Sequence, residues 1–497
     1  MSKFVINHTT SQGFDLKLQT GLFIDNDFVE GAGTIDTINP STEQVICSVH
    51  AADANLVNTA VDSAEKAYNE IWSKTSALER QRLLLKLADL VERDTEELAQ
   101  IETLDNGKPI SQARNHELPF VIDCIRYYAG YCDKVHGKTI PTPGCLSYTK
   151  YEPYGVVAGI IPWNVPLIMF SWKIAPALAA GNTIVIKTSE ITALSALKMA
   201  SLIKEAGFPA GVVNVITGYG HIAGDALARH HKVKKIAFTG SGNVGRLIMK
   251  ASAETNFKNV TLELGGKSPN IIFDDLDDQS LEQAVKYTYI GIFSNSGQIC
   301  YGGSRVFVQD GIYDRFIEKF KSIIQNNSIG DPHNESTKQG PQISKTQMDR
   351  VLEYIESGKS EGALITAGGK RYGDKGYFIE PTIFTNVTPD MRIMKEEIFG
   401  PVVCVARFKD TAEVIKSANE TIYGLAAGVF TQKITRAVEV SDALQAGTVW
   451  VNMYGQFDCN TPFGGYHQSG IGRELGQEAM SNYYQIKSVK ININRNI

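Results

Sequence analysis

A single cysteine between glycines is the first candidate for chemistry in this chain. Cys300 lies in the segment FSNSGQICYGGSR, residues 293–305, and no second cysteine is close to it in sequence. Glycines allow the backbone to turn tightly and to approach a ligand closely, so a thiol on such a segment could act as a nucleophile. The alternative is that Cys300 is a small core residue, as most free cysteines are.

Glu263 is the residue that could act together with this thiol. It lies in an apolar, strand-like run, VTLEL at residues 260–264, directly before a pair of glycines. Apolar surroundings raise the pKa of a carboxyl group toward neutrality, which suits a general base or acid. The structural alternative is a strand-end ion pair with Lys267. Considered together, Cys300 and Glu263 favour a nucleophile and its base.

Composition indicates the class of protein that contains Cys300 and Glu263. The chain has 497 residues, of which 43% are hydrophobic and 21% charged, and its net charge is −5. These values are typical of a globular protein with more than one domain, and the acidic balance argues against nucleic-acid binding. Seven cysteines without a C-x-x-C pair argue against a zinc ribbon and a disulfide scaffold, and the histidines show no H-x-x-x-H spacing. We therefore expect a reducing compartment and no metal.

The N-terminal residues and the longest apolar stretches indicate the cellular compartment. Residues 1–20 contain no apolar core of signal-peptide length and no arginine, so we expect neither a secretory signal nor an Arg-rich transit peptide. The longest apolar stretches, such as residues 154–162, are too short to span a bilayer. The sequence therefore predicts a cytoplasmic protein without a membrane span.

Alternating helical and strand patterns predict how the candidate residues are positioned. Apolar residues at helical spacing are separated by charges at 56–72 and 77–103, and the short apolar run at 154–162 is typical of a buried strand. The alternation continues through helices at 167–180, 194–206 and 222–229 and strands at 181–187, 212–216 and 235–239. This β-α-β succession predicts a parallel sheet with helices on both faces, and a dinucleotide could lie across the carboxyl ends of its strands.

A second α/β unit is expected after Glu263. Its predicted elements are a strand at 304–308 and helices at 281–293, 313–324, 346–358 and 410–419. No repeat or low-complexity linker separates the two units, so we expect them to share a cleft. Two segments fit neither unit, namely a predicted hairpin at 134–153 and an alternating strand at 487–494. Such a strand leaves an exposed edge unless another chain covers it, which predicts an oligomer.

Two strand ends carry residues that could bind a dinucleotide. The segment GSGNVG, residues 240–245, follows the strand ending at Thr239 and formally matches G-x-G-x-x-G. No acidic residue follows it at the spacing that the full dinucleotide-binding fingerprint requires. We therefore predict only that small residues and a helix N-terminus face a pyrophosphate here. Glu190, close after Lys187, could accept both ribose hydroxyls and repel a 2′-phosphate, which favours NAD over NADP. The alternative is a helix N-terminus capped by Ser189.

Several short motifs occur together in the order known from one enzyme family. They are PWNVP at 162–166, KTSE at 187–190, FTGS at 238–241, LELGGKSP at 262–269, GQIC at 297–300, EEIFGP at 396–401 and PFGG at 462–465. The chain resembles the NAD-dependent aldehyde dehydrogenases over nearly its whole length, and among them the tetrameric general enzymes of cytosol and mitochondria.

This resemblance implies a fold and an assembly. The fold is α/β, with a Rossmann-like parallel-sheet cofactor domain at 1–133 and 154–262 and an α/β catalytic domain at 263–480. A small β oligomerisation arm is implied at 134–153 and 481–497. The implied assembly is a homo-oligomer, either a tetramer or a dimer.

The resemblance also implies a role for each candidate catalytic residue. Cys300 is the nucleophile that attacks the aldehyde carbonyl, while the Asn164 amide and the Cys300 backbone N–H stabilise the oxyanion. Loss of hydride to the nicotinamide leaves a thioester, which is hydrolysed by water that Glu263 activates. Lys173 and Glu474 resemble a proton-relay pair that leads away from Glu263.

The implied cofactor is NAD, and its binding residues follow from the same motifs. They are Ile161, Pro162, Trp163, Lys187, Glu190, Gly220, Gly240, Ser241, Val244, Glu397 and Phe399. Lys187 and Glu190 are placed on the adenosine ribose and Glu397 on the nicotinamide ribose. Trp163 and Phe399 are placed beside the nicotinamide.

A substrate tunnel is implied as well. Its lining is Val165, Met169, Trp172, Ile299, Tyr301, Phe457 and Phe463. Val165, Ile299 and Tyr301 depart from the commonest family pattern, and the large apolar groups favour a medium-sized uncharged or aromatic aldehyde. The physiological aldehyde stays open.

Three other functions are compatible with the same fold. They are an amino- or betaine-aldehyde-specific dehydrogenase, a related acyl-transferring enzyme and a non-catalytic structural protein. Glu263 argues against acyl transfer, because a base that activates water would hydrolyse the thioester. The intact set of Cys300, Glu263 and Asn164 argues against the structural alternative.

Overall fold

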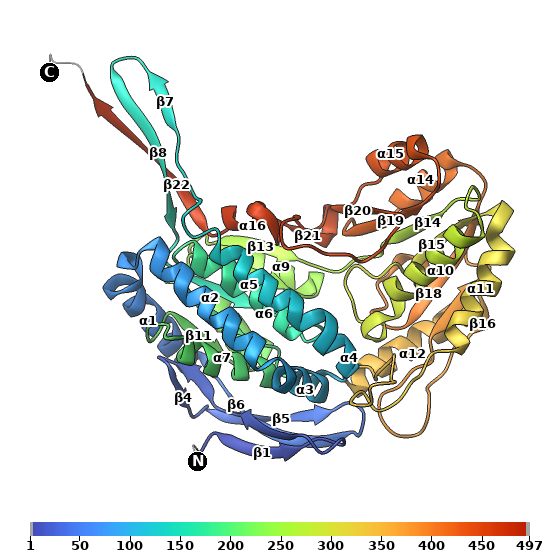
Figure 1. Ribbon diagram of the computed structural model, residues 1–497, viewed down its shortest axis with the longest axis horizontal. Helices are drawn as coiled ribbons and strands as arrows, with labels where there is room; N and C mark the ends of the chain where they lie inside the picture. Colours follow the sequence, from blue (N-terminus) through green and yellow to red (C-terminus); the bar gives the residue numbers. More distant parts are fainter. Residues whose placement is uncertain (1–2, 494–497) are drawn as a thin grey trace.

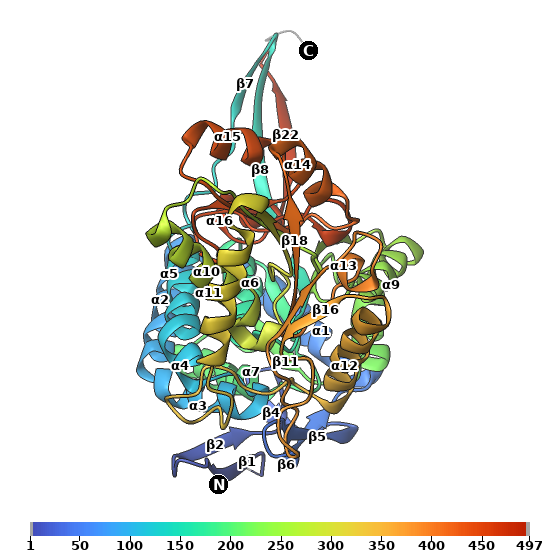
Figure 2. The same cartoon turned by 90° about the vertical axis from the view of Figure 1, so that its right-hand side faces the viewer.

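Two β-sheets covered by helices make up the body of the molecule, and a narrow arm projects from it (Figure 1). The computed structural model describes residues 3–493. Seen from the side, the arm extends well beyond the helices of both units (Figure 2). The predicted α/β class with parallel sheets is confirmed.

The first sheet has eight strands in the order β21-β13-β12-β9-β10-β11-β3-β4. Its five central strands run parallel and are β9 (Val156–Ile160), β10 (Thr183–Lys187), β11 (Val213–Ile216), β12 (Lys235–Thr239) and β13 (Asn259–Glu263). The antiparallel strands at its edges are β21 (Gly470–Ile471), β3 (Leu22–Ile24) and β4 (Asp27–Val29). Strands β9 to β12 are buried along their whole length because helices cover both faces, which explains their almost continuously apolar sequences.

Three helices of the first unit lie within two residues of the predicted ranges 56–72, 167–180 and 194–206, whereas the structure differs from the predictions at 77–103 and 222–229 and has helices at 110–129 that were not predicted. The helices of this unit are α1 (Ala54–Glu70), α2 (Ala77–Arg93), α3 (Thr95–Asn106), α4 (Ile110–Gln112), α5 (Leu118–Ala129), α6 (Pro166–Ala179), α7 (Leu194–Ala206), α8 (Asp225–Arg229) and α9 (Gly242–Glu254). The single helix predicted at 77–103 is wrong, because the chain divides into α2 and α3 at Asp94. The Asp94 backbone leaves the helical region, with ψ of 17°, and its carboxylate pairs with Arg93 and Lys198. The segment at 222–229 begins as a π-helical turn, Gly220–Gly224, before α8.

The second sheet has seven strands in the order β16-β17-β18-β15-β14-β19-β20. They are β14 (Pro269–Ile272), β15 (Arg305–Gln309), β16 (Leu364–Ala367), β17 (Thr382–Thr385), β18 (Val402–Phe408), β19 (Ala426–Phe430) and β20 (Thr448–Val451). Its helices are α10 (Asp278–Phe293), α11 (Tyr313–Gln325), α12 (Lys345–Ser360), α13 (Arg392–Lys395), α14 (Thr411–Asn419) and α15 (Ile434–Ala443). Only residues 264–268 separate β13 of the first sheet from β14 of the second.

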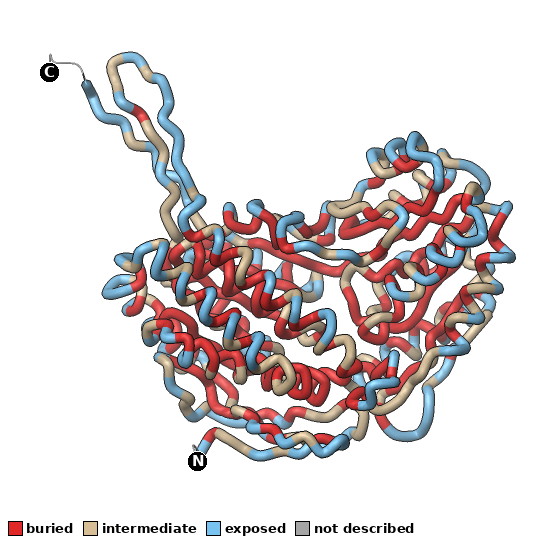
Figure 3. Tube along the Cα trace, viewed as in Figure 1, coloured by how far each residue is buried: buried red, intermediate tan, exposed pale blue. Residues whose placement is uncertain are grey.

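The arm is a three-stranded sheet in the order β22-β8-β7, with bounds β7 (Thr139–Thr142), β8 (Cys145–Pro153) and β22 (Tyr484–Asn492). Strand β22 therefore begins three residues before the predicted strand at 487–494, and residues 494–497 lie outside the described part of the chain. Strand β22 pairs with β8 along its whole length. Figure 3 shows that the arm is mostly exposed, whereas buried residues concentrate in the two sheets and the helices packed on them.

Two hairpins and one short helix complete the fold. Strands β1 (Val5–Thr9) and β2 (Asp15–Gln19) form one hairpin, and β5 (Gly33–Asn39) and β6 (Gln44–Ala51) form another along the same side of the body (Figure 1). Helix α16 (Gly476–Ser481) precedes the arm strand β22. Within residues 3–493 no helix is both long and apolar enough to cross a membrane.

A buried ion triad lies between α3 and α5. The Lys108 ammonium is fully buried and lies 3.2 Å from Glu102 and 2.5 Å from Glu117. Burial raises the pKa of Glu102, and the two carboxylates raise the pKa of Lys108 even though burial alone would lower it. Each charge in this triad is therefore tolerated in the core because the other two are present.

We predict that Lys108→Met destabilises the protein strongly. Removing the ammonium leaves two buried carboxylates facing each other, which costs about 3–5 kcal/mol for a broken buried ion pair. The measurement is the urea denaturation midpoint. Lys232→Met is the matched control, because Lys232 also contacts two carboxylates but its side chain is 43% exposed; loss of such surface ion pairs should leave the midpoint nearly unchanged. Equal midpoints for the two variants would contradict the prediction.

Candidate active site

The loop that carries Cys300 has an unusual backbone. Asn295, Ser296 and Gly297 all have positive φ, at 48°, 57° and 74°. A side chain at Gly297 would place its Cβ 2.1 Å from the carbonyl oxygen of Gly400, so only glycine fits there. The Cys300 side chain is half-buried at the end of this tightly turned segment.

Hydrogen bonds from a neighbouring segment hold this loop in its strained conformation. The Ser296 hydroxyl donates to the Gly340 carbonyl over 2.8 Å, and the Gln342 amide donates to the Ser296 carbonyl over 3.0 Å. The Gln298 side-chain oxygen accepts from the Ile343 N–H over 2.9 Å. Left-handed conformations cost on the order of 1–2 kcal/mol for residues other than glycine, and these contacts offset that cost.

Glu263 is the last residue of β13 and is brought against Cys300. Its side chain is buried, and within the described residues one carboxylate oxygen has no hydrogen-bond partner. Burial raises the pKa of Glu263 to about 8, while the neighbouring Cys300 thiol acts in the opposite direction. Burial, and then the Glu263 charge, raises the pKa of Cys300 well above its usual range. The pair is therefore a protonated thiol beside a carboxyl group that titrates near neutral pH.

The two glycines after Glu263 are what allow this approach. A Cβ at Gly266 would lie 2.6 Å from the Cys300 carbonyl oxygen. The alternative ion pair between Glu263 and Lys267 is not formed, because the Lys267 ammonium is buried without a hydrogen-bond partner among the described residues. Burial lowers the pKa of Lys267 to about 8.

Asn164 lies in the turn between β9 and α6 and faces the same loop. Its side-chain amide donates to the Gln298 carbonyl over 3.0 Å, two residues before Cys300. The Asn164 carbonyl in turn accepts from the Asn295 amide over 2.9 Å. The thiol, the carboxylate and the amide named from the sequence are thus on three segments that contact one another. Asn295 and Gln298 were not predicted to take part in this network, although Gln298 lies within the GQIC motif at 297–300.

Lys173 and Glu474 form a buried ion pair beside Glu263. The Lys173 ammonium donates to the Glu474 carboxylate, and both charges act on the pKa of Glu263, Lys173 lowering it and Glu474 raising it. Lys235, which no sequence motif indicated, is also buried here and donates to the Thr261 hydroxyl. Burial lowers the pKa of Lys235 well below its usual value.

The predicted ribose-binding pair lies at the carboxyl end of β10. The Lys187 ammonium lies 3.2 Å from the Glu190 carboxylate, and burial lowers the pKa of Lys187. The alternative of a helix capped by Ser189 is wrong, because α7 begins at Leu194 and its N-cap residue is Ala193. The hydroxyl of Ser189 instead accepts from the N–H two residues further on.

The other predicted dinucleotide residues follow neighbouring strands of the first sheet. Residues 161–162 follow β9, Gly220 begins the π-helical turn after β11, and Gly240 follows β12. Ser241 is the N-cap of α9, and its hydroxyl accepts from the Val244 N–H over 3.4 Å. Four adjacent parallel strands therefore end at one edge, where the α9 N-terminus is also found, and such an arrangement suits a pyrophosphate.

The predicted nicotinamide residues lie near the Cys300 loop, where the charge of Glu397 acts on the pKa of Cys300. The Trp163 and Phe399 rings pack edge to face with centroids 5.3 Å apart. The Glu397 carboxylate accepts from the Gly266 N–H over 3.1 Å, and burial raises the pKa of Glu397 to about 7. A Cβ at Gly265 would overlap this carboxylate.

Aromatic rings form most of the predicted tunnel wall. Phe457 contacts Tyr301 and Phe463 with ring centroids 4.9 and 5.1 Å apart, and Trp172 lies 5.7 Å from Phe463. Phe120 of α5 also lies at this wall, with its ring 6.3 Å from that of Trp172. No sequence pattern marks Phe120 as a tunnel residue, because an apolar residue is expected on an amphipathic helix whether or not a ligand binds nearby.

The smaller tunnel residues lie on the segments of Asn164 and Cys300. Val165 packs against the core directly after Asn164, Met169 follows in α6, and Ile299 directly precedes Cys300. Met169 and Ile299 are buried. Trp450 of β20 is another residue of the tunnel wall that was not predicted, and its ring lies 5.8 Å from that of Tyr301.

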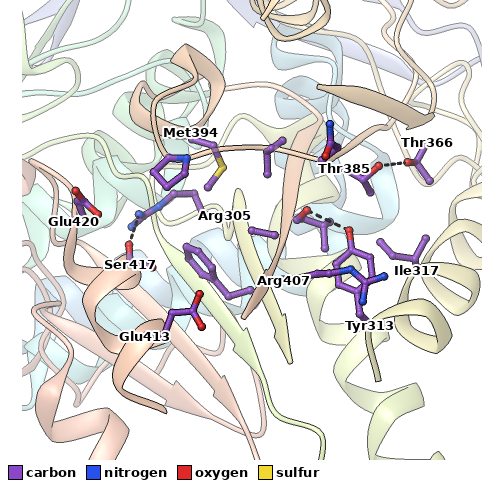
Figure 4. A pocket seen from close by; sticks show the side chains of 16 residues that line it. Arg305, Tyr313, Ile317, Thr366, Thr385, Met394, Arg407, Glu413, Ser417 and Glu420 are labelled. Carbon is purple, nitrogen blue, oxygen red and sulfur yellow. Dashed lines mark hydrogen bonds between the residues drawn. The ribbon is translucent and has the colours of Figure 1, made fainter. Parts of the chain in front are cut away.

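A separate cavity of about 520 Å³ contains none of the predicted site residues. It opens where β17 no longer pairs with β18, and α11 and α14 contribute to its wall (Figure 4). Arg305 donates to the carbonyls of Ser417 and Ala418 at the end of α14, and Arg407 pairs with Asp314. These cationic groups already have partners, so the cavity is not the candidate active site.

Metal-ligating side chains do not cluster within the described residues, since no three His, Cys, Asp or Glu side chains there are placed to hold an ion.

Comparison with known proteins agrees with the geometry. Residues 28–489 match the model of the aldehyde dehydrogenase family. The chain is 54% identical to an aldehyde dehydrogenase of Alternaria alternata over 98% of both chains, and 51% identical to retinal dehydrogenase 2 of Mus musculus over 95% of this chain and 92% of that one. A solved NAD+ complex of an aldehyde dehydrogenase from Bacillus cereus is 50% identical, with a TM-score of 0.94 over 96% of this chain and 97% of that chain. The chain belongs to the aldehyde dehydrogenase family.

Proposed function

We propose that this chain oxidises an aldehyde to the carboxylic acid with NAD as the hydride acceptor, through a covalent adduct on Cys300. The observation that carries the proposal is the placing of the half-buried Cys300 thiol beside the buried Glu263 carboxyl group, with the Asn164 amide on an adjacent segment. A non-catalytic protein of the same fold would have no need of a carboxyl group whose pKa is raised by burial next to a thiol.

Addition of the thiol to the aldehyde is the first step. The Cys300 sulfur forms a bond to the carbonyl carbon, and Glu263 is placed to accept the thiol proton because the two groups lie close enough to shift each other's pKa. Negative charge then develops on the carbonyl oxygen, for which the Asn164 amide is the proposed donor. Removing one such preorganised donor typically costs about 3 kcal/mol of transition-state stabilisation.

The described residues suit NAD at the edge of the first sheet. Small residues and the α9 N-terminus would hold the pyrophosphate, Lys187 and Glu190 the adenosine ribose, and Glu397 the nicotinamide ribose. The Bacillus cereus relative was solved with NAD+, which supports this assignment. The Glu190 carboxylate would repel a 2′-phosphate and so favours NAD over NADP. When bound, NAD supplies the acceptor for the hydride that leaves the substrate carbon.

Hydrolysis of the resulting thioester is assigned to Glu263. Its unpartnered carboxylate oxygen can take a proton from water once the carboxyl group is ionised. The neighbouring ion pair of Lys173 and Glu474 is proposed to carry away the thiol proton that Glu263 accepted in the first step, which leaves Glu263 ionised. As the carbon–sulfur bond breaks and the acid is released, the proton taken from water passes from Glu263 to the sulfur, which returns Cys300 to its thiol form.

An uncharged aliphatic or aromatic aldehyde of medium size is the proposed substrate. The rings of Trp172, Tyr301, Phe457 and Phe463 contact one another along the wall and present apolar surface. Such a wall does not compensate the loss of water around a charged substrate.

The division into domains is proposed as residues 1–133 and 154–262 for NAD, 263–480 for catalysis, and 134–153 with 481–497 as an oligomerisation arm. Separate sheets for the three parts support this division, although β21 at 470–471 pairs with β13 of the first sheet. Exposed apolar residues on the arm support a homo-oligomer, since water would otherwise cover Ile140, Leu146, Ile486 and Ile491.

We predict that Cys300→Ala abolishes NADH formation from acetaldehyde and from longer aldehydes, by at least about 1,000-fold, because no other group can form the adduct. NAD binding, measured by titration calorimetry, should be retained. Cys145→Ala is the matched control, since Cys145 is the other half-buried free cysteine among the described residues and lies on the arm. Normal turnover in Cys300→Ala would remove this residue from the mechanism.

We also predict that hydrolysis of the acyl-enzyme accelerates with rising pH and levels off above about 8. The pKa of Glu263 is raised by burial to about 8, so below that pH the carboxyl group is protonated and cannot act as a base. The rate should fall about tenfold per pH unit below the pKa. Single-turnover deacylation measured by stopped flow gives the profile.

Glu263→Gln tests the same assignment. The amide cannot take a proton from water, so acyl-enzyme should accumulate and the pH dependence should disappear. An unchanged steady state in rapid-mixing experiments would mean that another group is the base.

A further inference from the structure

Asn106 is a buried residue whose side chain reaches the turn that carries Asn164. It is the last residue of α3 and is only 1% exposed. Its amide nitrogen donates to the Trp163 carbonyl over 2.7 Å and to the Asn164 carbonyl over 3.3 Å. Its side-chain oxygen has no hydrogen-bond partner among the described residues. The side chain therefore makes its described hydrogen bonds only as a donor to this turn.

The Asn164 carbonyl is held from two sides. Besides Asn106, the Asn295 amide donates to it over 2.9 Å, and Asn295 also donates to the Gln298 carbonyl over 3.2 Å. The Asn164 side chain donates to that same Gln298 carbonyl. Asn106 thus holds the backbone of Asn164, whose side chain is hydrogen-bonded to the Cys300 loop.

The end of α3 is itself rigidly placed, so it can serve as a fixed support. Gly107 ends the helix with φ of 84°, and a Cβ there would come within 2.8 Å of both Pro40 and Pro341. One turn earlier, the Glu102 carboxylate accepts from the Leu167 N–H over 3.4 Å in the first turn of α6. The last turn of α3 therefore contacts both ends of the segment from 163 to 167.

We infer that Asn106 is a positioning residue for aldehyde addition, which keeps the Asn164 amide where the oxyanion forms. This inference rests on the proposed function, because it assigns Asn106 an effect through Asn164. A displacement of about 1 Å in such a group can cost up to about 100-fold in rate. A purely structural role would instead affect all reactions of Cys300 equally.

Two reagents separate these roles on the intact protein. Acylation of Cys300 by p-nitrophenyl acetate forms a carbon–sulfur bond, passes through an oxyanion and releases p-nitrophenolate, while Glu263 takes the thiol proton. Alkylation by iodoacetamide also forms a carbon–sulfur bond but displaces iodide at a saturated carbon, so no oxyanion develops. We expect Asn106→Ala to slow acylation about 10- to 100-fold and to leave alkylation within about twofold.

Asn182→Ala is the matched control. Asn182 is fully buried and its amide likewise donates to two carbonyls, those of Ala177 and Tyr483, at 3.3 and 2.7 Å. The ratio of the acylation rate to the alkylation rate should not change in this variant. If Asn106→Ala does not fold, Asn106→Asp keeps the volume and removes the donor, and the same ratio is measured on it.

A double-mutant cycle tests whether Asn106 acts through Asn164. In the Asn164→Ala background the further change Asn106→Ala should slow acylation by less than about twofold, because the donor it positions is gone. Equal losses in both backgrounds, a joint fall of acylation and alkylation, or an unchanged ratio would each overturn the inference. Wild-type protein that is not acylated at Cys300 would instead refute the proposed function, so the two failures are distinguishable.

Discussion

A thiol and a carboxyl group must be kept together in the core, and neither can be given a permanent counter-ion if both are to react. Glu263 comes from the end of a strand in the first sheet, whereas Cys300 comes from a loop before a strand of the second. Burial raises the pKa of both groups, so the pair is costly, and the two sheets have to be placed accurately to bring it together. The short connection from β13 to β14 achieves this, because its two glycines leave room for the Cys300 and Glu397 segments.

Strain in the nucleophile loop follows from the same requirement. Asn295 and Ser296 adopt left-handed conformations, which are unfavourable for residues with a side chain. Contacts with Gly340 and Gln342 hold the Ser296 end of the loop, and Asn295 joins it to the Asn164 turn. Strained backbone of this kind persists where the surroundings specify it from several directions, as they do at this site.

Much of the fold could be predicted from local sequence patterns. The helix at 194–206 has the predicted bounds, and β9, β10 and β12 lie within their predicted ranges, because apolar periodicity reports burial directly. The break between α2 and α3 was not predicted, because apolar residues of both helices pack into the same core and the helical spacing of apolar residues continues past Asp94. Phe120 and Trp450 were missed for a different reason, because only packing between distant segments brings their rings to Trp172 and Tyr301.

The sequence by itself determined the reacting groups and the kind of fold, because a thiol, a carboxylate, an amide and the period of apolar residues are properties of the chain before it folds. Cys300 and Glu263 could be named on that basis, whereas Asn164 was named from the family resemblance. Only the tertiary structure decided what each of them contacts. The proximity of Cys300 to Glu263, the raised pKa of both, and the support of Asn164 by Asn106 depend on pairs of residues that are 37 and 58 positions apart in sequence and meet only in the folded protein. Burial and hydrogen bonding are properties of that packing, so no local pattern could report them.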